Sequence, residues 1–251
     1  MSNIAVSVES GKSLKLPTAG KYCDRDIAVT ATGSNDAFWE EFQQGGNRSN
    51  YSNAFRIGWT NSIFKPKYDI AGSGSFASAF AATDIFGDLA ILLEGLGRKL
   101  DTSRATSLNS LFYNAAKLTR VPVIDASGAS DITYMFDSAT ALQTIDKVIL
   151  KSNGSQSMNA FRNLTALENL TIEGVIGQNG LDIHWSTKLS KASLISIVNA
   201  LSTTTTGLAV TLSKTAVNTA FETEAAAANG TESQQWLALI ATRGNWTISL
   251  I

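Results

Sequence analysis

The chain has 251 residues, of which 44% are hydrophobic and only 16% are charged, and its formal net charge is −1. Average proteins carry about 25% charged residues, so we expect a neutral polar surface that attracts neither nucleic acid nor an anionic membrane. The sequence has no run of about 18 apolar residues, so we expect no membrane insertion. Its single cysteine, Cys23, excludes an internal disulfide. The start of the chain has no basic region followed by an apolar one, so we also expect no secretory signal.

Residues 1–33 are predicted to form a small β module. Three alternating runs between residues 4 and 31 are typical of strands, and glycine-containing turns separate them. Residues 34–50 are expected to be a linker with one helix over 37–43. Asp36 can cap the start of this helix, and the glycine pair at 45–46 can end it.

The segment 51–176 repeats an apolar pattern with a period of about 24 residues, a length typical of repeat architectures. Its anchors are five phenylalanines whose intervals agree to within one position, except for a longer one after the second: Phe55, Phe80, Phe112, Phe136 and Phe161. Further apolar columns keep step with the anchors, and the column six positions after them includes Leu118, Leu142 and Leu167. A fixed period of this length indicates a stack of similar units, so we expect the anchors and these leucines in a shared core.

Each unit is predicted to open with a short helix, because the apolar positions four before an anchor and at the anchor are one helical turn apart. The columns nine and twelve positions after the anchors fall in β-prone runs, such as 121–124 and 145–150. Such a unit cannot bury its own apolar face, so stacking would create one core and a parallel sheet. The longer interval, between Phe80 and Phe112, is expected to hold an insertion around residues 94–103 and a lengthened helix that ends at Gly95 or Gly97.

Residues 177–251 depart from the repeat and are predicted to cap it. We expect three helices and two strands here, at 190–201, 215–228 and 232–242 and at 209–212 and 246–250. The last unit of a solenoid needs an atypical end that shields it. The predicted fold class is therefore α/β: a solenoid of one short helix and one short strand per unit, an N-terminal β module and an α/β C-terminal cap.

Two units also resemble a known repeat. Residues 107–114 and 131–138 resemble the "sxxxMFxxcxxLtxi" unit of bacterial surface-type leucine-rich repeats, over roughly residues 50 to 176. The methionine of that unit is kept as Met135. Its cysteine position carries Ala115, Ala139 and Leu164. The resemblance implies that the predicted solenoid is of the leucine-rich-repeat class.

Residues 11–30 are similar to a short β module of tail and tail-fibre proteins from phages of Gram-positive gut bacteria. Together, the two stretches resemble a phage or prophage tail-associated leucine-rich-repeat protein. This resemblance implies a non-enzymatic virion component without cofactors, assembled in the host cytoplasm, that contacts other tail proteins or a host-surface glycan or protein. We expect a homo-oligomer. The alternatives are a bacterial cell-surface adhesin of the same repeat class and a glycan hydrolase.

We interpret the residues that could be catalytic or bind a metal as structural residues. His184 is the only histidine and Cys23 is about 160 residues away, so neither a zinc site nor a histidine-dependent nucleophile is predicted. The glycine-rich stretch 71–75 lacks a following lysine, so we expect a loop and not a phosphate site. Carboxylates that could pair for glycan hydrolysis, but that more often cap turns and helices, are Asp84 with Asp88, Asp125 with Asp131, and Glu222 with Glu224.

Exposed aromatic residues are the candidates for binding. We seek them among Trp39, Tyr51, Trp59, Tyr113 and Tyr134. Tyr113 and Tyr134 each lie close to an anchor, where they could form a ladder that stacks on a sugar or on a partner surface. Partly buried flanking residues are the alternative interpretation. We predict no catalytic residue and no metal ligand.

Overall fold

The structure is a computed structural model that describes residues 46–56, 59–62, 64–66, 68–221 and 232–251. Within these residues it is a mixed α/β fold with parallel sheets, four helices and no closed barrel. The β module expected at 1–33 and the helix expected at 37–43 lie outside the described residues.

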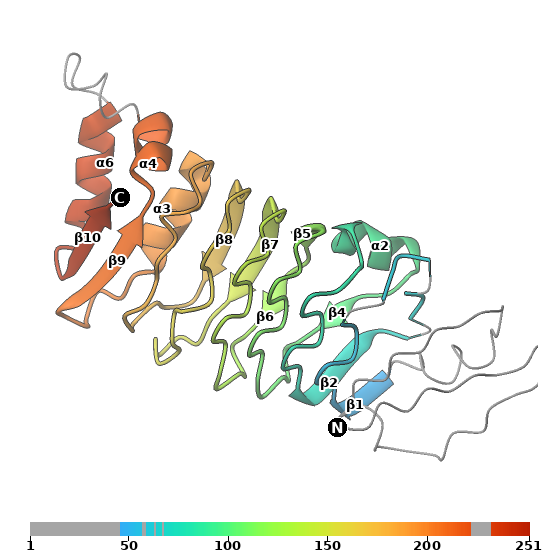
Figure 1. The fold of residues 1–251 in the computed structure, drawn as a ribbon. Helices are drawn as coiled ribbons and strands as arrows, with labels where there is room; N and C mark the ends of the chain where they lie inside the picture. The colour runs from blue at the N-terminus through green and yellow to red at the C-terminus, as the bar shows by residue number, and fades with distance from the viewer. Residues whose placement is uncertain (1–45, 57–58, 63, 67, 222–231) are drawn as a thin grey trace, which may run out of the picture.

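Ten short strands and four helices follow one another along a single row, with the labelled helices along one side of it (Figure 1). The strands are β1 (Gly46–Asn50), β2 (Ile70–Ser75), β3 (Gly87–Asp88), β4 (Leu100–Asp101), β5 (Leu118–Val121), β6 (Ile124–Asp125), β7 (Thr144–Ile149), β8 (Asn169–Glu173), β9 (Leu208–Leu212) and β10 (Trp246–Leu250). The helices are α2 (Leu89–Gly95), α3 (Lys191–Ala200), α4 (Lys214–Phe221) and α6 (Glu232–Ala241).

The paired strands come from neighbouring units of the sequence repeat. Val121 of β5 aligns with Ile145 of β7, which aligns with Leu170 of β8, so successive partners are offset by one repeat period. β1, β2 and β4 form a second parallel sheet, and β9 and β10 form a third. The predicted parallel arrangement of strands is thereby confirmed. It also includes β1, although its residues fall in the segment 34–50 that we expected to be a linker.

The segments around the anchors are turns, so the prediction of a short helix in each unit is wrong. The positions two before and two after Phe112 have positive φ: 55° at Ser110 and 53° at Asn114. The N–H of Tyr113 closes a turn onto the Ser110 carbonyl, whereas the N–H of Phe112 donates to the Met135 carbonyl in the next unit. A helix would use these donors internally. Hydrogen bonding between units therefore replaces the helix with turns.

The five anchors form one buried column of stacked rings. The centroids are 4.9 Å apart for Phe55 and Phe80, 5.3 Å for Phe80 and Phe112, and 5.6 Å for each of the next two pairs. Four rings are fully buried and Phe55 is 8% exposed. The aligned leucines Leu118, Leu142 and Leu167 are fully buried as well. Each stacked aromatic pair adds about 0.5–1.5 kcal/mol beyond its area burial, so the column stabilises the contact between successive units.

The longer interval between Phe80 and Phe112 contains α2. Its N-cap is Asp88, whose carboxylate accepts a hydrogen bond from the Ile91 N–H at 2.9 Å. The helix ends at Gly95, the first of the two predicted ends. The helix begins at Leu89, however, in a column where we expected a strand. The stretch 71–75, expected to be a loop, lies within strand β2 between β1 and β4.

The C-terminal helix α3 covers the edge of β8 that has no following strand. The buried Ser193 hydroxyl donates to the Glu168 carbonyl at 3.0 Å and accepts from the Leu170 N–H at 2.9 Å. The Ser196 hydroxyl accepts from the Ile172 N–H at 2.8 Å. These side chains satisfy strand groups that would otherwise form a reactive edge.

The residue ranges of α3 and of the elements that follow it largely agree with the sequence prediction. α3 follows its N-cap Ser190, and the predicted helix over 232–242 is confirmed as α6. The helix predicted over 215–228 is confirmed as far as Phe221, and its remainder lies outside the described residues. The predicted strands at 209–212 and 246–250 are β9 and β10, which pair in parallel.

Candidate contact surfaces

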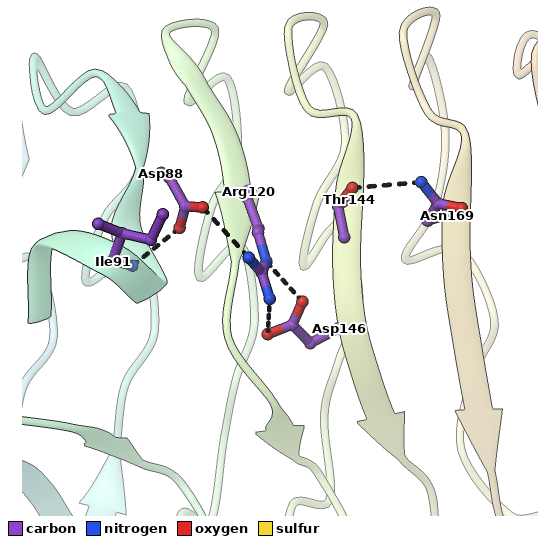
Figure 2. A network of polar contacts seen from close by, with 6 residues as sticks. All are labelled: Asp88, Ile91, Arg120, Thr144, Asp146 and Asn169. Atoms are coloured by element: carbon purple, nitrogen blue, oxygen red, sulfur yellow. Dashed lines mark hydrogen bonds and ion pairs between the residues drawn. The ribbon is translucent and has the colours of Figure 1, made fainter. Parts of the chain in front are cut away.

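A network of half-buried polar side chains links β3, β5 and β7 (Figure 2). Arg120 on β5 donates to both carboxylate oxygens of Asp146 on β7, at 2.7 and 3.2 Å, and to Asp88 at 3.4 Å. The hydrogen bond to Asp146, followed by that carboxylate's charge, raises the pKa of Arg120. Asp88 also caps α2, so this network links α2 to β5 and β7.

Paired charges and neutral side chains continue across the neighbouring strands. Lys147 of β7 pairs with Glu173 of β8 at 2.9 Å, and Lys117 pairs with Asp84 at 2.6 Å. The Asn169 amide donates to the Thr144 hydroxyl at 3.5 Å. Exposed ion pairs contribute about 0–1 kcal/mol each, so their main effect is on the surface itself. It presents hydrogen-bonding groups whose charges are mutually compensated.

The candidate carboxylates within the described residues have structural partners. Asp84 and Asp88 are engaged with Lys117 and Arg120. Asp125 accepts from the Ser127 N–H and hydroxyl at 2.9 and 2.6 Å, which fixes the turn after β6. Asp131 accepts from the Thr133 N–H and from the Asn109 amide, at 2.9 and 3.0 Å. The interpretation as turn and helix caps is supported for Asp88, Asp125 and Asp131, whereas Asp84 forms an ion pair. Glu222 and Glu224 lie outside the described residues.

The described part of the chain has neither a metal-binding cluster nor a membrane-spanning helix. No group of three or more His, Cys, Asp or Glu side chains there could hold a metal ion. No helix in that part is long and apolar enough to cross a membrane. Cys23 lies outside the described residues.

The predicted binding aromatics differ in exposure. Tyr51 is only 2% exposed and stacks on Phe76 at 4.8 Å, so it belongs to the core and the expectation that it is exposed is wrong. Trp59 is half-buried and packs edge-on against Phe55 at 5.4 Å. Trp39 lies outside the described residues. Tyr113 and Tyr134 are 44% and 40% exposed.

Tyr113 and Tyr134 occupy different positions along the turns of their units. Because Phe112 stacks on Phe136, Tyr113 is level with Asp137 and Tyr134 is level with Ser110. Tyr134 has φ of 58°, which is rare for a bulky residue. The units before it have smaller residues with positive φ at the same position: Asn53, Ser78 and Ser110.

A cleft of about 430 Å³ opens between the turn at 152–153 and the loop at 199–205. Its lining is mostly serine, threonine and asparagine, with Arg243 as its one cation among the described residues. The Arg243 guanidinium donates to the carbonyls of Asn199 and Thr242, at 2.9 and 3.0 Å, near the ends of α3 and α6. These hydrogen bonds link the two helix ends. The positive charge of the arginine is also favourable there, because helix C-termini carry partial negative charge.

The structure brings together one aromatic group that the sequence interpretation missed. His184 and Trp185 are the central residues of a turn closed by a hydrogen bond from the Ser186 N–H to the Ile183 carbonyl, at 3.0 Å. Trp185 is 50% exposed, and its ring centroid lies 4.4 Å from that of His184. The one available signal was a tryptophan next to the chain's only histidine. His184 itself is hydrogen-bonded to Asp182.

Comparisons with protein-family models, with curated proteins and with solved structures found no match to this chain.

Proposed function

We propose that this protein is a tail-associated component of a phage or prophage particle, and that its main body is a leucine-rich-repeat solenoid with a contact function. The supporting observation is the column of five stacked phenylalanines at repeat spacing, with parallel strand pairing at the same offsets. Stacked units of this kind share one core, and the solvent-facing side chains of each unit are available for contact.

The hydrogen bonds of the turns support the same proposal. The N–H groups of Leu108, Ser110, Phe112 and Asn114 all donate to carbonyls of the following unit, at 2.7–2.9 Å. A unit on its own would leave these donors without partners, which is unfavourable wherever they are buried. The stability of each unit therefore depends on stacking. Its outward side chains are not needed for that stacking, so they can be suited to a ligand.

A contact role is favoured over hydrolysis by the engagement of Asp84, Asp88, Asp125 and Asp131 in ion pairs and caps. The balanced polar surface suits a hydroxyl- and amide-rich ligand, so the proposed partners are a host cell-surface glycan or another tail protein. Weak contacts of this kind gain strength when several copies act together, which is why the proposal includes a homo-oligomer.

Antibody labelling tests the place of the protein. Antibody against the full chain is applied to particles released from the source strain and imaged by negative stain. Label on particle tails supports the proposal. Label on the cell envelope, with none on the released particles, overturns it and favours the surface adhesin.

A sedimentation assay tests the activity. The purified full chain is incubated with cell-wall polysaccharide from Gram-positive gut bacteria, and both the bound protein and the soluble sugar are measured. Retention of the protein without release of sugar supports a contact role. Release of soluble sugar overturns it in favour of the glycan hydrolase.

A further inference from the structure

We propose that the turn carrying Asp182, His184 and Trp185 is a saccharide-binding platform that holds one sugar ring against the exposed face of the Trp185 indole. This inference deepens the proposed contact function and rests on it for its biological role.

The indole is held in place by its neighbours. The His184 ring lies beside it at 4.4 Å with an interplanar angle of 39°. The His184 Nδ1 is 2.5 Å from an Asp182 carboxylate oxygen, which also accepts from the His184 N–H at 3.4 Å. Asp182 thus fixes the imidazole, and the imidazole supports the indole.

The turn below the platform is anchored in the core. Ile183 and Ser186 are fully buried on either side of it. The Ile183 N–H donates to the Thr211 carbonyl at 2.9 Å, and the Ser186 hydroxyl donates to the Leu164 carbonyl at 2.9 Å. The backbone is therefore bound on both sides. A rigid aromatic on a fixed turn loses little conformational freedom when a ligand binds.

These contacts also argue against nucleophilic catalysis at this histidine. The nearby Ser186 hydroxyl is buried and directed to the Leu164 carbonyl, so it is not held by the imidazole as an activated nucleophile would be. The His–Asp pair therefore serves to position the ring next to the indole. The Asp182 side chain is 40% exposed, so it remains partly accessible to solvent.

The surroundings favour a sugar over an apolar protein surface. After the buried Ser186, the next residues in the chain, Thr187 and Lys188, are exposed and polar. A protein interface normally buries several hundred Å² on each partner around a cluster of apolar residues. A single exposed indole flanked by hydrogen-bonding groups instead matches the apolar face and the hydroxyl edge of one pyranose ring.

The direct test is an NMR titration of the tryptophan indole N–H signals in the full chain. Trp185→Phe assigns the Trp185 signal, and the ligands are methyl glycosides of glucose, galactose, N-acetylglucosamine and rhamnose, each up to about 100 mM because one ring contact gives millimolar affinity. We expect at least one glycoside to shift the Trp185 signal saturably. The buried Trp246 indole, which donates to the Ser202 carbonyl, should not move. No shift with any glycoside, or equal shifts of both indoles, would overturn the platform.

Binding to cells separates this inference from the proposed function. The wild-type chain, Trp185→Ala and the control Phe86→Ala, which removes a 60%-exposed ring elsewhere, are compared on Gram-positive gut bacteria. At least about tenfold weaker binding by Trp185→Ala alone supports the platform. Equal binding by all three overturns the platform and leaves the proposed function standing. No binding by any of them counts against the proposed function, while the titration still decides the platform. Binding that is lost after protease treatment of the cells, and kept after periodate treatment, overturns the saccharide assignment in favour of a protein partner.

Discussion

The rings of Phe112 and Phe136 lie almost parallel, with an interplanar angle of 6° and centroids 5.6 Å apart. They occupy equivalent positions in successive units of the repeat, and both are fully buried. Each ring covers a face of the next, so the stability of one unit depends on its neighbour.

Phe136→Ala should therefore destabilise the whole stack. We expect the free energy of unfolding to fall by about 3–5 kcal/mol, because the substitution leaves a cavity between Phe112 and Phe161. The measurement is urea denaturation followed by circular dichroism. Tyr113→Ala, which removes an exposed ring nearby, is the control and should change stability by less than about 0.5 kcal/mol. Equal effects of the two substitutions would contradict the buried column.

Tyr134→Asn should stabilise the protein. Tyr134 has φ of 58°, and asparagine adopts this region at lower cost, so the expected gain is about 1 kcal/mol. Thermal unfolding measures the change. Tyr113→Asn is the matched control, because Tyr113 is a similarly exposed tyrosine outside the set of positive-φ residues. A lower midpoint for Tyr134→Asn than for its control would show that the ring contributes more than the backbone conformation costs.

Gly174→Ala should destabilise the turn after β8. Gly174 has φ of 95°, and a Cβ at this position would overlap the backbone carbonyl of Leu150. Strained positions of this kind cost on the order of 1–3 kcal/mol. Gly95→Ala is the control at the end of α2, where φ is not positive and a Cβ meets nothing within 4 Å. Chemical denaturation should show a loss for Gly174→Ala and no loss for Gly95→Ala, and the reverse order would refute the close approach.

Ser193→Ala should loosen the edge of β8 without unfolding the chain. The substitution removes the acceptor of the buried Leu170 N–H, a loss of about 1–3 kcal/mol. Amide hydrogen exchange should accelerate at Leu170. Ala192→Ser, at the adjacent exposed position of α3, should leave that exchange rate unchanged. Unchanged protection at Leu170 in Ser193→Ala would mean that the serine hydroxyl does not cap the strand.

Ser103→Ala should lower the free energy of unfolding only above acidic pH. The hydrogen bond from the Ser103 hydroxyl, at 2.7 Å, is the largest cause of the lowered pKa of Asp101. A lowered pKa stabilises the folded state above the ordinary Asp value of about 3.9, and this contribution is lost as the pH falls through the folded value. Because Asp101 is largely solvated, we expect the substitution to lower the free energy of unfolding by about 0.5 kcal/mol at pH 7.

Stability curves at pH 7 and near pH 2 test this pH dependence. The difference between wild type and Ser103→Ala should be present at the higher pH and vanish at the lower one. Ser157→Ala, which changes an exposed serine, is the control and should show no pH-dependent difference. A difference that persists at the lower pH would place the effect outside Asp101.

Several features of the molecule could be predicted from the sequence. The spacing of Phe112, Phe136 and Phe161 indicated one buried column, and the β-prone runs after them indicated parallel strands. Burial in a stack of similar units requires apolar residues at a fixed interval, and such an interval can be recognised in the sequence. The helix start at Ser190 was equally local, because one hydroxyl caps the first turn.

Only the tertiary structure decided how the segments between the strands fold. Apolar residues four apart fit either a helical turn or two overlapping β-turns, and carbonyl acceptors such as that of Met135 in the adjacent unit select the turns. The bonds of Arg120 to Asp88 and Asp146 span 32 and 26 residues, and they depend on strand register across an insertion that composition does not specify. The exposure of Trp185 likewise depends on which side of a turn faces the core. Local sequence determines which side chains seek burial, whereas the partner that each backbone donor finds is known only when the units lie side by side.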